Sequence, residues 1–297
     1  MNDNTLNMAL QLSVQDMFTS SWFTGAVMNK VWTEVMRSSL NGLGRNAGGA
    51  DLLGVALGGS LRGDAAMLRQ ASSNLTEAQA MMNMAADAAG NIASQLKEAK
   101  TLADDFLAAT QGMNVTDPDY APIYERFQAQ YQAIGKNIDA VIKNTTYNGI
   151  ALLDGNAWNN GGERLTVTRN ASNAPLAASV HIQAGDNGFP LTFNNMAAEF
   201  SDVAGRHMLV DATWPWAPRQ DVASELSSLQ RSAQNMADLY AGRAGSLGNQ
   251  SASLRSQATI LEEAAARQIR TPEPVNTEKL LLDLILRDSG TIFSAKG

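Results

Sequence analysis

Cysteine is absent from the 297 residues, and histidine occurs only twice. The first absence excludes a disulfide framework and a thiolate metal site. The two histidines, His181 and His207, lie far apart without companions at ligand spacing, so we expect no metal or catalytic role for either. A phosphate loop, a zinc motif and a nucleophile elbow are also missing. The sequence therefore predicts no cofactor and no enzymatic activity.

Positive charge is scarce, and long apolar runs are lacking. Lys and Arg total 22 against 29 Asp and Glu, a net charge of −7, and no basic run exceeds two residues, which argues against nucleic-acid binding. No segment reaches about eighteen uninterrupted apolar residues, so we predict no membrane span. The first residues lack a basic segment and a small-residue cleavage site. We therefore expect export, if it occurs, without a cleavable signal peptide.

Proline is also rare, with eight residues in all and none in 1–117 or 219–271. Such stretches are compatible with long helices. Apolar or small residues recur at alternating three- and four-residue steps over Leu75–Phe106, over Tyr124–Val141 and along 219–271, which is the spacing of helices packed lengthwise. The sequence predicts a mainly α fold whose long antiparallel helices form a coiled-coil rod. The predicted rod core comprises Leu75, Met82, Ile92, Leu96, Phe106, Phe127, Ile134, Ile138, Leu226, Leu229, Met236, Leu247, Leu254 and Leu261.

Glycine and a change of period interrupt the helical pattern in two places. Glycines in residues 41–63 predict an irregular connector with one short helix around Asp51–Leu57. Between residues 150 and 196 the apolar period becomes two, which predicts a small β-hairpin region, and 197–218 is expected to be a loop that returns to the helices. The Asn148-Gly149 pair predicts a tight turn just before the hairpin region.

The two terminal segments are the most apolar helical stretches of the chain. Residues 5–40 combine valines at four-residue steps with two tryptophans, and 278–294 is rich in leucine and isoleucine. An isolated subunit does not offer an obvious cover for these stripes, so we expect the terminal helices to pair with those of neighbouring subunits in a core domain. The residues predicted to carry self-assembly are Phe18, Trp22, Phe23, Val27, Val31, Trp32, Val35, Leu281, Leu284 and Ile285.

Four stretches resemble the bacterial flagellin family. Ser38-Ser39-Leu40 with Arg45-Asn46 resembles the family's N-terminal Ser-Ser-Gly-Leu-Arg-Ile-Asn motif. Lys143–Leu153 is similar to the stretch in which an Asn-Gly turn joins the rod helices to a hairpin. Val180–Gly188 is similar to the hairpin segment that follows, and Ile285–Ala295 looks like the family's C-terminal stretch. The order and spacing of these matches cover nearly the whole chain.

The resemblance implies a short, divergent flagellin with core and rod domains and almost no outer domain. The implied division is an N-terminal core helix at 1–40, rod halves at 41–149 and 219–271, a hairpin and loop region at 150–218, and a C-terminal core helix at 272–297.

The resemblance also implies a function and partners. The chain is expected to be a structural subunit, secreted to the extracellular bacterial flagellum, where it forms a helical homo-polymer. Implied partners are the flagellar export apparatus, an export chaperone, and hook-junction and cap proteins. Two alternatives stay open: a flagellin-related protein of the hook–filament junction, and a surface ligand-binding module that uses the tryptophan loop Trp214–Trp216.

Overall fold

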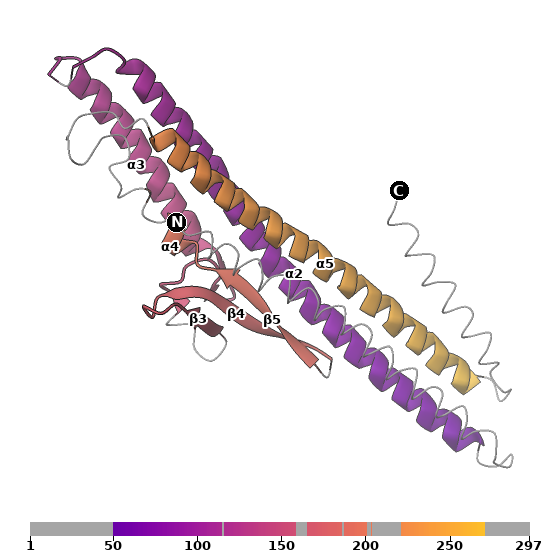
Figure 1. Cartoon of the computed structure of the whole chain (residues 1–297). Coiled ribbons are helices and arrows are strands. Elements are labelled where there is room, and N and C mark those ends of the chain that lie inside the picture. Colours follow the sequence, from indigo (N-terminus) through magenta and orange to yellow (C-terminus); the bar gives the residue numbers. More distant parts are fainter. Residues whose placement is uncertain are drawn as a thin grey trace. The chain divides into compact units, whose positions relative to one another are not determined.

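The computed structural model describes residues 50–114, 116–158, 165–185, 187–200, 203 and 221–270. These residues fall into two compact units. One comprises Ser73–Ser251, and the other comprises the described residues 50–72 and 252–270. Figure 1 shows the long helices α2, α3 and α5 and the strands β3, β4 and β5. The fold is mainly α, as predicted from the heptad spacing.

Helix α2, Ala50–Ala109, has 60 residues and supplies the longest apolar stripe. Between Leu61 and Phe106 its buried positions recur at steps of three and four residues, which alternate strictly from Leu75 onward, so that one narrow face is covered along its length. Many of these positions are alanine, which allows neighbouring helices to approach closely. The fully or almost fully buried members include Ala65, Leu75, Ala78, Met82, Ala85, Ala89, Ile92, Leu96, Ala99, Ala103 and Phe106.

The predicted irregular connector over 41–63 is wrong for its described part. Residues 50–63 are helical and belong to α2, while 41–49 lie outside the described residues. Each glycine in a helix costs about 1 kcal/mol relative to alanine. Here the helix continues because Leu61, Ala65 and Leu68 are buried along one side, and packing outweighs the low helix propensity of the glycines.

Helix α3, Tyr120–Asn144, folds back antiparallel on the C-terminal half of α2, as the second heptad run predicted. Gly112, at φ +80°, follows the end of α2, a backbone conformation that glycine adopts without strain. An aromatic cluster then joins the two helices. The Phe106 ring lies 5.6 Å from that of Phe127 and 6.3 Å from that of Tyr120.

A two-residue hairpin follows α3. Strands β1, Thr146–Tyr147, and β2, Ile150–Ala151, pair antiparallel around the Asn148-Gly149 turn. Both turn residues have positive φ, +48° and +79°, as a type I′ hairpin turn requires. The turn predicted from this residue pair is confirmed.

The β region is a three-stranded antiparallel sheet in the order β3-β4-β5. Its strands are β3, Leu165–Arg169, β4, Pro175–Ala184, and β5, Asn187–Asn194. The inward face carries Val180, Ile182, Leu191 and Phe193, all buried, so alternate residues form a small core as their period predicted. A short helix, α4, Ala197–Phe200, follows the sheet, and α5, Val222–Arg270, is the last described helix.

The aromatic cluster makes Phe106 a sensitive position for stability. Phe106 is only 1% exposed, so Phe106→Ala leaves a cavity at the end of α2 and is expected to lower the free energy of unfolding by about 3–5 kcal/mol. Urea denaturation followed by circular dichroism measures the change. Met84→Ala is the matched control on the same helix, because Met84 is 38% exposed and alanine keeps the helix propensity. Equal losses in the two variants would contradict the packing described.

Candidate functional site

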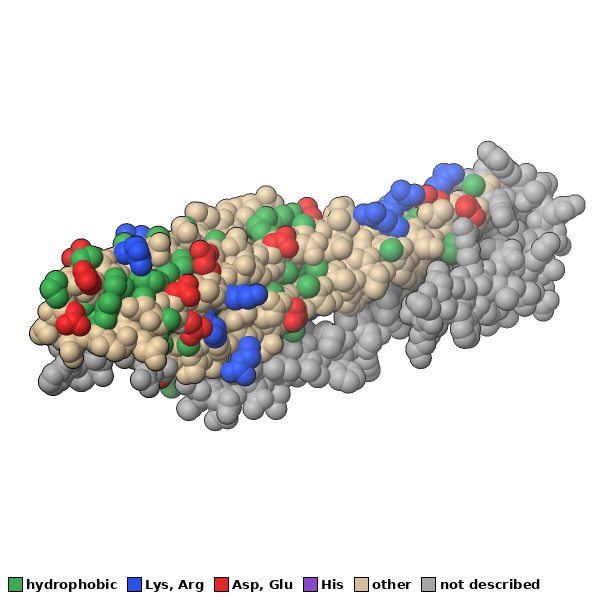
Figure 2. All heavy atoms as spheres, turned by 90° about the horizontal axis from the view of Figure 1, so that it is seen from above, with side chains coloured by type: hydrophobic (Ala, Val, Ile, Leu, Met, Phe, Trp, Pro, Cys, Tyr) green, Lys and Arg blue, Asp and Glu red, His purple; other side chains and the backbone are tan. Residues whose placement is uncertain are grey.

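The described residues contain no assembled reactive centre. Among them, no group of three or more His, Asp or Glu side chains could hold a metal ion. His181 is exposed on β4, and His207 lies outside the described residues. No described helix is both long and apolar enough to cross a membrane. On the face shown in Figure 2, acidic and basic side chains are interspersed, so the described part of that face lacks a broad field of one sign. The candidate functional surfaces are the contacts that join the helices to one another and the sheet to the helices.

In the unit Ser73–Ser251, helices α2 and α5 are held in antiparallel register by polar contacts beside the apolar stripe. The hydroxyls of Thr76 and Ser251 lie 3.0 Å apart and form a hydrogen bond. One turn away, the end of the Gln79 side chain lies against Gly248, 2.7 Å from where a Cβ would stand. These contacts select one alignment of two helices whose alanine-rich stripes would otherwise pack in several.

The other unit has its own pairing of α2 with α5. Arg255 donates from Nε to the hydroxyl of Ser72, which is buried, over 2.9 Å. Arg69 and Glu262 form an ion pair at 2.6 Å. Both of these side chains are well exposed, so the ion pair contributes little to stability, while the bond to buried Ser72 defines the pairing.

The three-stranded sheet is attached to α5 through the edge of β5. The hydroxyl of Tyr240 accepts a hydrogen bond from the Asn194 backbone N–H at 2.9 Å, and Arg243 donates to the Thr192 carbonyl at 3.0 Å. The Tyr240 ring packs 6.1 Å from that of Phe193. Burial raises the pKa of Tyr240 to about 12, although the bond from Asn194 and the nearby charge of Arg243 act in the opposite direction.

Helix α2 holds the opposite end of the sheet. The Asn74 side chain donates to the Gln183 carbonyl at 2.7 Å, close to the turn between β4 and β5. The sheet of this unit is thus fastened by α5 near the end of β5 and by α2 near the end of β4.

Asn195 organises the segment between the sheet and α4. Its side-chain carbonyl accepts from the Gly155 N–H at 3.0 Å, and its amide donates to the Pro175 carbonyl at 2.8 Å. The Asn195 side chain fills the space that a Cβ on Gly155 would need. Nearby, Trp158 is buried and donates from its indole to the Ala151 carbonyl at 2.9 Å. Sequence reasoning did not single out Asn195 or Trp158, because their contacts join positions separated along the chain.

Helix α4 reaches α5 through one carboxylate. Glu199 accepts a hydrogen bond from the Ser232 hydroxyl at 2.6 Å. Burial raises the pKa of Glu199, and the bond from Ser232 partly offsets this rise. The carboxylate therefore anchors α4, at an electrostatic cost when it is ionised.

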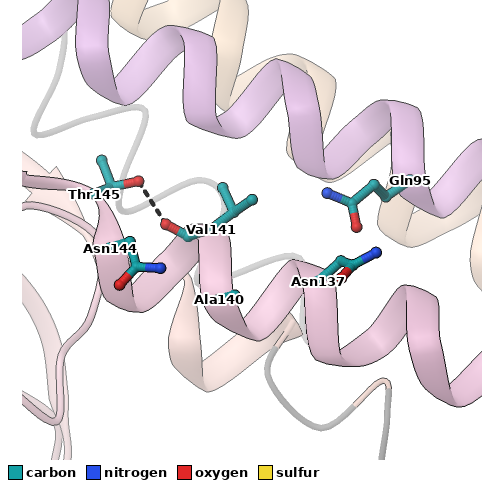
Figure 3. A pocket seen from close by; sticks show the side chains of 6 residues that line it. All are labelled: Gln95, Asn137, Ala140, Val141, Asn144 and Thr145. Carbon is teal, nitrogen blue, oxygen red and sulfur yellow. Dashed lines mark hydrogen bonds between the residues drawn. The ribbon is translucent and has the colours of Figure 1, made fainter.

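An open groove of about 480 Å³ lies between α2 and α3. Figure 3 shows that Gln95 reaches from α2 toward Asn137 on α3. The Gln95 amide nitrogen donates to Asn91 at 2.7 Å. The groove is lined by neutral side chains only: Gln95, Asn137, Ala140, Val141, Asn144 and Thr145.

The structure places the predicted rod-core residues as follows. Twelve are buried, namely Leu75, Met82, Ile92, Leu96, Phe106, Phe127, Ile134, Ile138, Leu226, Leu247, Leu254 and Leu261. Leu229 and Met236 are partly exposed, and the buried seam of α5 passes through Ala237. On α3, Val141 is partly exposed and lines the groove, while Ile142 is buried.

The predicted self-assembly residues lie outside the described residues. This applies to Phe18, Trp22, Phe23, Val27, Val31, Trp32, Val35, Leu281, Leu284 and Ile285, and also to the tryptophan loop. Their role stays a prediction.

Long antiparallel helices with a small docked sheet define a mainly helical protein whose candidate sites are packing surfaces. Residues 29–157 match the family model for the bacterial flagellin N-terminal helical region. No curated protein matches the chain. The match spans less than half of the chain and supports membership of the bacterial flagellin family, which the resemblance predicted. This family is structural, and the match supports a flagellin-like structural role.

Burial of Tyr240 predicts a loss of stability in strong alkali. Because the folded protein holds the phenol proton more tightly than the unfolded chain, this contribution is fully present below pH 10 and is lost as the pH rises toward about 12. The wild type is expected to lose about 3 kcal/mol more than Tyr240→Phe across that interval. Urea denaturation at several pH values measures, for the wild type and for Tyr240→Phe, how steeply the free energy of unfolding falls with pH. Since Tyr120 and Tyr124 remain in both proteins, identical slopes would show that Tyr240 does not titrate as its burial requires.

Proposed function

We propose that this protein is a structural subunit that self-assembles into an extracellular bacterial flagellar filament. The family match over residues 29–157 carries this proposal. It includes the described parts of α2 and α3 and the hairpin that follows them. The buried stripe of α2 supports it further, because helices packed lengthwise suit a subunit that must transmit force.

Assembly is proposed to use the apolar stripes of the terminal segments. Contacts between different patches on successive copies generate an open helical polymer, in contrast to a closed ring. Burying roughly 1,000 Å² of apolar surface per subunit would contribute on the order of 25 kcal/mol before the cost of ordering is subtracted. The export apparatus, an export chaperone, and the hook-junction and cap proteins are the partners proposed with this function.

Trp32→Asp tests the proposed assembly surface. A carboxylate in a buried apolar contact between subunits is strongly unfavourable, so this variant should form no polymer. Sedimentation and negative-stain electron microscopy of the purified full chain measure the loss. Trp32→Phe is the matched control, since it keeps an aromatic side chain and should assemble. Helical circular dichroism must be unchanged in both. Normal filaments from Trp32→Asp would contradict the proposal.

The location of the protein distinguishes the candidate functions. Immunogold electron microscopy on producing cells should label the whole filament. A single spot near the hook would favour the junction protein, and label away from any filament would favour the surface-binding module.

A further inference from the structure

The outer edge of β5, which is the side of the strand turned away from β4, is bonded to side chains of α5. The Thr192 carbonyl and the Asn194 N–H bond to α5 side chains, so both groups point away from β4. The pairing of β4 with β5 continues without a register shift over the whole strand. Backbone groups alternate between the two sides of a strand. Gly188 and Pro190 therefore face the same outer edge as Thr192 and Asn194.

We propose that Tyr240 and Arg243 cap this edge and prevent it from pairing with β5 of a second copy of the chain. An added strand would need the Asn194 N–H and the Thr192 carbonyl, and both are already bonded. Pro190 has no N–H to donate. Three of the four outward positions on β5 thus lack a group that an incoming strand needs.

The composition of β5 explains why its edge requires protection. The strand has eight residues and contains no charged side chain. Phe189, Leu191 and Phe193 alternate along it, a pattern with high β propensity. Pro190 removes one backbone donor, but the strand carries no charge that would repel a copy of itself, and that copy is always present at the protein's own concentration.

Strand β3, at the other edge, differs in each of these respects. It has five residues, and its pairing with β4 is irregular between Thr168 and Arg169. A short strand with a shifted register and a terminal cation is a poor template for pairing. The two caps are therefore found on the longer, neutral and regular edge strand.

The caps are held in place by their own packing. Tyr240 is fully buried, and its ring lies against Phe193. Arg243 lies one turn further along α5 and is partly buried. Side chains three residues apart share one face of a helix, so one face of α5 presents an acceptor and a donor to the strand.

The double variant Tyr240→Phe/Arg243→Ala tests the caps in the full chain. Hydrogen exchange at the Asn194 amide should accelerate by about tenfold in dilute protein, because this amide loses its acceptor. At higher concentration the variant should associate with a rise in thioflavin T fluorescence, which reports intermolecular β-structure. Ser232→Ala is the matched control on α5, since it loses the contact with Glu199 and leaves β5 untouched.

A third variant separates edge pairing from simple destabilisation. Adding Thr192→Lys to the double variant places a charge on the edge strand, which should suppress association without restoring the caps, even though the hydroxyl bond between Thr192 and Ser179 is lost. Suppression would support the proposal. Unchanged association of the triple variant, association of Ser232→Ala to the same extent, or a double variant that behaves as the wild type would each overturn it. Helical filament assembly does not raise thioflavin T fluorescence, so the result is independent of the proposed function.

Discussion

The stripe of alternating four- and three-residue steps on α2 is the constraint on which the described structure depends. Many of its buried members are alanine, so each position contributes little apolar area and stability must accumulate over many turns. The larger side chains gather where α2 ends, around Phe106, and close the α2–α3 pair with an aromatic cluster. Because the contact residues of α2 are small, the helices that pack on it approach closely. Polar side chains beside the stripe are then near enough to form hydrogen bonds between helices.

Those polar contacts supply the specificity that an alanine stripe lacks. Alanine faces tolerate sliding, because one small side chain packs much like the next. The bond between Thr76 and Ser251 would be lost after a shift of one turn. Apolar burial thus provides the stability, while hydrogen bonds to the hydroxyls of Ser72, Thr76 and Ser251 fix the alignment.

Local signals predicted the elements, and their failures have a common cause. The heptad spacing predicted α2, α3 and α5, and the Asn148-Gly149 pair predicted the hairpin turn, because period and turn chemistry are properties of neighbouring residues. Glycines led to a wrong connector over 50–63, where packing outweighs propensity. The roles of Asn195 and Arg243 depend on partners 20 to 51 residues away along the chain, and no local sequence pattern predicts these contacts.

The sheet is attached to α5 because two side chains of the helix reach two backbone groups of β5, although the two elements space their residues differently. Alternate residues of β5 present outward groups about 7 Å apart, whereas residues three apart on α5 rise by about 4.5 Å. The rigid phenol of Tyr240 reaches the nearer group, and the long side chain of Arg243 spans the difference to the next. Because Arg243 donates and a tyrosine hydroxyl can accept, the pair satisfies one carbonyl and one N–H in turn. An edge bonded in this way is part of the helix–sheet contact.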